Sequence, residues 1–119
     1  MARKDALRLR AKKKFTSAAL QTLYSDVVKP GMIYCLEQIA WEIDTVLSGG
    51  NERARLYIAG HGYNHNLAQS TSPSADKLYT YTKKPYLYPG ERLALDLDEA
   101  QADTTAELHA TGYWEALKE

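Results

Sequence analysis

The histidines are the residues whose type and spacing most resemble a metal or catalytic site. His61 and His65 lie four residues apart in the segment IAGHGYNHNLAQS, and His109 is the third histidine of the chain. On a helix, two histidines at this spacing converge on one zinc ion. Glycine and asparagine surround them, however, and both are poor in helix interiors. On a strand the two side chains lie about 13 Å apart at ~3.3 Å per residue, which is too far to share a metal ion. The segment therefore predicts a polar strand without a metal site.

Two carboxylates, Asp96 and Asp98, are the next candidates, because a pair on one strand face could serve glycoside hydrolysis or bind calcium. They alternate with leucines in ERLALDLDE, so they fall on the outer face of a strand whose inner face is apolar. Charged residues are typical of such a solvated face. The sequence has no Gly-x-Ser-x-Gly motif, and Cys35 has no histidine near it in the sequence. We predict that the protein is not an enzyme and has no cofactor. A cupin-like metal-binding enzyme that uses the three histidines stays open as an alternative.

Four of the nine tyrosines gather within ten residues, in the segment LYTYTKKPYLYPG. Alternation places each of two pairs on one strand face: Tyr79 with Tyr81, and Tyr86 with Tyr88. Tyrosine joins an apolar ring to a polar hydroxyl, so such a cluster suits a protein interface, a saccharide platform or ordinary cross-strand packing. We take the four tyrosines as a candidate subunit interface. A carbohydrate-binding β-sandwich module is the alternative function.

The net charge of zero hides an uneven distribution. Residues 1–14 have a net charge of +6, and the rest of the chain holds 14 of the 15 acidic side chains. The basic residues of this first segment are Arg3, Lys4, Arg8, Arg10, Lys12, Lys13 and Lys14. Such asymmetry indicates a segment that meets a partner, either an acidic protein surface, on a sister subunit or another neighbour, or nucleic acid. A solvated tail would show the same composition.

The elements that must position these residues are predicted to be mainly strands. The first segment, from about Lys4 to Leu23, could be a helix, since Ala, Leu, Arg and Lys favour helices. Beyond it, about seven or eight short strands alternate with turns such as Pro30-Gly31. In KPGMIYCLEQIAWEID, a polar Glu37 interrupts the shared parity of five apolar or aromatic residues, which predicts either a bulge or a strand that crosses an open edge. These five are Ile33, Cys35, Ile39, Trp41 and Ile43.

These patterns predict an all-β protein with an antiparallel β-sandwich, jelly-roll-like, over residues 20–119. Residues 1–19 are predicted to be a basic N-terminal arm that could be partly helical. The length of 119 residues is typical of one domain. A single cysteine excludes an internal disulfide and indicates a reducing compartment. No run of ~18 apolar residues is present, so we expect no membrane segment.

Four segments resemble small β-sandwich virion proteins of tailed phages, namely capsid decoration (cement) and head-neck proteins. They are KPGMIYCLEQIAWEID, ARLYIAGHGYNHNLAQS, YLYPGERLALDLDE and TTAELHATGYWE, which together span most of the chain. The resemblance implies a symmetric oligomer on a virion, with no cofactor and no catalytic residues, and no motif carries a functional residue over. We therefore expect a structural virion protein, made in the host cytoplasm. It would bind its own copies and neighbouring capsid or neck proteins through the basic arm and the tyrosines. Nucleic acid is a further candidate partner for the arm.

Overall fold

The fold is an antiparallel β-sandwich, as the sequence predicts. A computed structural model describes residues 4–14, 21–44, 53–71, 78–98 and 105–116. These ranges contain strands and turns and no helix. The strands are β1 (Lys4–Lys14), β2 (Gln21–Tyr24), β3 (Met32–Ile43), β4 (Arg53–Gly60), β5 (Tyr63–Thr71), β6 (Tyr79–Tyr81), β7 (Tyr86–Leu87), β8 (Arg92–Asp98) and β9 (Thr105–Ala116).

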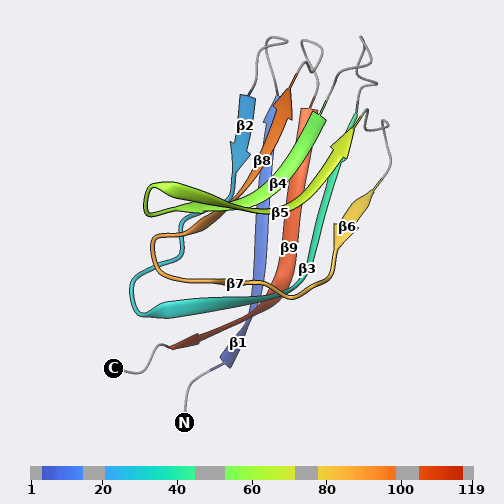
Figure 1. The fold of residues 1–119 in the computed structure, drawn as a ribbon. Coiled ribbons are helices and arrows are strands. Elements are labelled where there is room, and N and C mark those ends of the chain that lie inside the picture. The colour runs from blue at the N-terminus through green and yellow to red at the C-terminus, as the bar shows by residue number, and fades with distance from the viewer. Residues whose placement is uncertain (1–3, 15–20, 45–52, 72–77, 99–104, 117–119) are drawn as a thin grey trace.

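Two sheets form the two layers (Figure 1). The first sheet has the order β1-β9-β3-β6, with β7 also paired to β3, and the second has the order β2-β8-β4-β5. On one side of the sandwich β1 and β2 come together, and Lys13 Nζ donates a hydrogen bond to the carbonyl oxygen of Thr22 at 3.1 Å. On the other side the layers end in β5 and β6 (Figure 1). The sandwich is therefore joined at one side and left more open at the other.

The basic N-terminal segment is a strand, and the helix expected over about Lys4 to Leu23 is wrong for its described part. β1 pairs antiparallel with β9 along its whole length. Leu9 is buried, and Leu7 and Ala11 pack beside it against the core. The alternating pattern LRLRAK lets one face of a strand bury its leucines, and this tertiary gain outweighs the helix propensity of the same residues. Lys4–Lys14 thus belong to the sandwich, and the remainder of the expected arm, 1–3 and 15–19, lies outside the described residues.

The bulge predicted in β3 is present. The register between β3 and β9 shifts between Leu36 and Gln38, so Glu37 is the extra residue. Three of the five residues of shared parity, those after the bulge, face the core. Ile33 and Cys35, before the bulge, do not belong to the core cluster, because the extra residue reverses the parity. Inward-facing residues of β3 are therefore Tyr34, Leu36, Ile39, Trp41 and Ile43.

Gly112 on β9 makes this bulge fit. It lies opposite Leu36 in the register. A Cβ atom at this position would stand 2.1 Å from the carbonyl oxygen of Cys35, which is backbone and cannot yield cheaply. A close approach of two backbones is a setting in which only glycine has room. The bulge in β3 therefore depends on a glycine at the facing position of β9.

Leucines of β8 form the centre of the core, as the sequence predicts. Leu93, Leu95 and Leu97 have no exposed surface. Within the first sheet, Trp41 stacks on its cross-strand partner Tyr79, with ring centroids 4.3 Å apart and planes 11° apart. This stack packs the short strand β6 onto the long strand β3.

Candidate functional site

The histidines do not come together. His61 lies in the two-residue turn between β4 and β5, where His61 and Gly62 have φ angles of 53° and 86°. Positive φ at both central residues is typical of a type I′ hairpin turn. His65 is exposed on β5, and His109 lies on β9 in the other sheet. The segment expected to be one polar strand is therefore a tight hairpin. Within the described ranges, no group of three or more His, Cys, Asp or Glu side chains could hold a metal ion.

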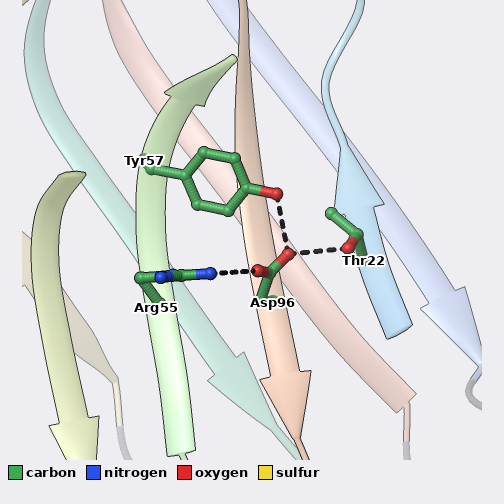
Figure 2. Close-up of polar contacts among 4 residues, drawn as sticks. All are labelled: Thr22, Arg55, Tyr57 and Asp96. Carbon is green, nitrogen blue, oxygen red and sulfur yellow. Dashed lines mark hydrogen bonds and ion pairs between the residues drawn. The ribbon is translucent and has the colours of Figure 1, made fainter. Parts of the chain in front are cut away.

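Asp96 is buried, contrary to the solvated position that the sequence predicts. Its side chain lies on the outer face of the second sheet but is only 5% exposed. Figure 2 shows its carboxylate between neighbouring strands, where it accepts three hydrogen bonds. Thr22 Oγ1 of β2 donates at 2.6 Å, Tyr57 OH of β4 at 2.8 Å and Arg55 Nη2 of β4 at 3.0 Å. Asp96 therefore joins β2, β8 and β4 through side chains. The side chain of Asp98 lies outside the description.

The electrostatics of this cluster favour a structural role over a reactive one. Burial, the hydrogen bond to Asp96 and the negative charge of Asp96 together raise the pKa of Tyr57 well above its usual range. Tyr57 thus stays a hydrogen-bond donor at any physiological pH. Because both carboxylate oxygens of Asp96 are already occupied by donors of its own chain, we assign the cluster to folding stability.

The basic residues of β1 form a column on one face. Arg8, Arg10, Lys12 and Lys14 alternate with inward-facing residues, and all four are exposed. Alternate residues on a strand lie about 6.6–6.8 Å apart, so the charges stand in a row at fixed spacing. We call these four residues the basic column. Beside it, Glu107 lies 4.0 Å from Lys12, a contact that solvent screens strongly.

The other residues of the expected arm take other places. Lys13 has the opposite parity and bonds to β2. Arg3 lies outside the described residues, and only the backbone of Lys4 is described. Because β1 ends its sheet, the basic column also lines an edge strand, where Lys and Arg discourage unspecific pairing with other strands.

The four tyrosines differ in exposure. Tyr79 and Tyr81 are half-buried and pack against the core. Tyr86 and Tyr88 are 53% and 50% exposed. Lys84, with a φ angle of 55°, turns the chain between the two pairs. Tyr79 and Tyr81 lie on β6 and Tyr86 lies on β7, and these strands pair with different parts of β3, while Tyr88 follows the end of β7.

A groove of about 510 Å³ opens beside the exposed pair. One wall comes from β4 and β5, through Ile58, His65 and Leu67. The other wall comes from the segment 81–91 and includes Tyr81, Tyr86 and Tyr88. We call this hollow the tyrosine groove. Its walls belong to the two different sheets, on the side of the sandwich where β5 and β6 end the layers (Figure 1). The sequence pointed to three of its tyrosines and, for the carbohydrate-binding alternative, to the His/Asn segment that holds His65, but it gave no signal for Ile58 or Leu67.

Comparisons with known proteins give a fold and no family. Neither the family models nor the curated protein sequences match this chain. The fold itself, an antiparallel sandwich of the jelly-roll-like class, is widely similar to solved structures. No helix among the described residues is both long and apolar enough to cross a membrane.

Two of the similar structures are viral. A chain in the acidic stable capsid structure of Helicobacter pylori bacteriophage KHP30 has a TM-score of 0.67 and 11% identity, covering 100% of this chain and 95% of that chain. A chain of infectious bursal disease virus, Gx strain, has a TM-score of 0.53 and 8% identity, covering 98% and 32%. PirA also has a TM-score of 0.53, with 9% identity over 85% and 92%. At such identities the likeness shows the fold alone.

Proposed function

We propose that the protein is a non-enzymatic structural subunit of a virion, a capsid decoration or head-completion protein. The observation that carries the proposal is the match to the KHP30 capsid chain, which covers nearly all of both chains. This sandwich, without an added domain, thus accounts for almost the whole of a chain from a phage capsid structure. The phage-like sequence segments support the same function.

The basic column is the proposed contact to neighbouring subunits. β1 is held along β9 by its backbone and on the core by its leucines, so the backbone that carries the four charges needs no ordering when they meet a partner. The chain beyond residue 14 holds eight basic and 14 acidic side chains, so this part of a sister subunit carries a net negative charge that attracts the basic column. Many such contacts in a symmetric shell add up, although each is weak.

The location of the protein can be tested on particles. Virus particles are purified by density gradient from cells that express the gene in its natural context. Mass spectrometry and immunogold electron microscopy should then find the protein in the particle fraction at a constant number of copies per particle. Finding the protein only in the particle-free fraction would contradict the proposal.

The contact mode needs a substitution that spares the fold. Deleting residues 1–14 would remove Leu9 from the core together with the charges, so it cannot separate the two effects. Arg8→Glu/Arg10→Glu reverses two exposed charges whose cross-strand partners, Thr111 and His109, carry no acid. We expect at least about tenfold lower occupancy on particles, because like charges then face each other across the interface.

The matched control is Lys29→Glu/Lys84→Glu, which makes the same charge change at two exposed turn residues. It should leave occupancy unchanged. Equal loss in both variants would mean that net charge matters and the basic column does not. Binding of the unaltered protein to an oligonucleotide, lost steeply as salt rises, would indicate nucleic acid as the partner of the column instead.

A further inference from the structure

We propose that the tyrosine groove binds a neutral saccharide, as a function separate from the subunit contacts of the basic column. Its volume of about 510 Å³ lies in the range of small-ligand sites. At its rim, Tyr86 and Tyr88 leave about half of their surface open to solvent. Inside, the groove reaches the core at Ile58, which is 8% exposed. It therefore offers aromatic and apolar surface that the described part of the chain does not cover.

The mixture of groups in the groove suits a sugar ring. A pyranose has apolar C–H faces and a rim of hydroxyl groups. Tyrosine rings attract C–H groups through their electron-rich faces, and their hydroxyls exchange hydrogen bonds with the ligand. Lys83 adds donors, Glu91 adds an acceptor, and His65 supplies a ring nitrogen of either kind.

The charges of the groove point to a ligand without net charge. Lys83 and Glu91 carry opposite charges and both line the groove. Glu91 would repel a phosphate or carboxylate ligand, and Lys83 would repel a cationic ligand. A neutral ligand with several hydroxyl groups is repelled by neither, because it can donate a hydrogen bond to Glu91 and accept one from Lys83.

An added peptide strand is a poorer occupant. β5 ends its sheet, so its outer edge could in principle pair with a peptide. At the groove, however, β5 has a bulge. Leu56 pairs with Ala68 and Tyr57 pairs with Asn66, which leaves Leu67 as the extra residue. A bulge breaks the even spacing of backbone groups that an incoming strand requires.

The turn that leads out of the groove is held in place before any ligand arrives. The backbone N–H of Tyr88 donates to Glu91 Oε1 at 2.7 Å. His61 Nε2 lies at hydrogen-bond distance, 3.0 Å, from the carbonyl oxygen of Pro89. The β4–β5 hairpin is thereby tied to the turn between β7 and β8. A site whose walls are already ordered loses less entropy on binding.

Nuclear magnetic resonance can test the proposal with defined probes. The ¹⁵N-labelled protein is titrated with the methyl glycosides of glucose, mannose and galactose and with N-acetylglucosamine, after a screen on a glycan array. We expect saturable shifts of amides in the tyrosine groove, such as those of Leu67 and Tyr86. In Tyr86→Ala/Tyr88→Ala the affinity should fall at least about tenfold, because the stacking surface is lost.

Tyr24→Ala is the matched control, since Tyr24 is an exposed tyrosine on β2, 41% exposed and stacked on Arg92. It should bind like the unaltered protein. The proposal is overturned if no saccharide binds on the array or in the titration, if shifts map outside the groove, or if the double variant keeps full affinity. A change of oligomeric state in the double variant, measured by light scattering, would overturn it in favour of a subunit contact. None of these outcomes bears on the basic column, which the variants of Arg8 and Arg10 test separately.

Discussion

Replacing Asp96 by alanine should destabilise the protein by about 3 kcal/mol. Asp96 is 5% exposed, and its carboxylate accepts hydrogen bonds from Thr22, Arg55 and Tyr57. The substitution removes all three bonds at once. It also leaves the hydroxyl of Tyr57, which is 4% exposed, without its acceptor.

The three bonds do not contribute equally. Hydrogen bonds to a charged group typically contribute about 1.5–3 kcal/mol each when they are shielded from water. Those from Thr22 and Tyr57 are in this class. The side chain of Arg55 is 41% exposed, so its ion pair contributes at most about 1 kcal/mol. Alanine, however, does not carry the desolvation cost of a buried charged carboxylate. This gain lowers the net loss of stability to about 3 kcal/mol.

Urea denaturation followed by tryptophan fluorescence measures this effect, with an unchanged slope as the sign that the same two states are compared. Asp26→Ala, at an exposed turn residue, is the control and should change the free energy of unfolding by less than about 0.5 kcal/mol. Tyr57→Phe should cost about 1–2 kcal/mol, since it removes one of the three bonds. A loss below about 1 kcal/mol for Asp96→Ala would refute the assignment of this cluster to stability.

Three further predictions concern other parts of the fold. The pKa of Tyr57 is raised from its ordinary value of 10.0, so its contribution to stability is complete below about pH 10. That contribution is lost as the pH rises above this value, because the unfolded chain releases the proton first. Urea midpoints between about pH 8 and 11 should show this loss, and Tyr57→Phe should lessen it. Gly112→Ala should cost more than about 2 kcal/mol in the same assay, because its Cβ would lie 2.1 Å from the carbonyl oxygen of Cys35; full stability would contradict the tight bulge. Leu9→Asp should cost more than about 3 kcal/mol, while Arg8→Asp should cost under about 1; equal effects would mean that β1 is not packed on the core.

The fold class could be predicted because its signal is local. The alternation in ERLALDLDE and the interruption at Glu37 depend on neighbouring residues only. The same local reasoning failed for residues 33–35, since parity before a bulge depends on where the partner strand accepts the extra residue. It failed also for the first segment, whose composition favours a helix. Only the second sheet, by burying Leu9, makes a strand the better structure there.

The candidate sites were less predictable than the fold. Tyr57 and Asp96 are 39 residues apart, and Thr22 and Asp96 are 74 residues apart, so no window of sequence could reveal their cluster. The tyrosine groove is likewise formed by residues that are distant in the sequence, since its walls come from two sheets. The sequence grouped Tyr79 and Tyr81, which pack against the core, with Tyr86 and Tyr88, which are about half exposed.

By itself, the amino-acid sequence determined that this chain forms strands with one apolar face, and that the first 14 residues carry a net positive charge. Those properties follow from residue type and a period of two, which act over a few neighbours. The tertiary structure alone decided that the basic segment is an edge strand, that Asp96 is buried, and that a groove lies beside Tyr86 and Tyr88. Each of these depends on pairing and packing between strands far apart in the chain, where the free energy of burial is shared among elements that no local pattern connects.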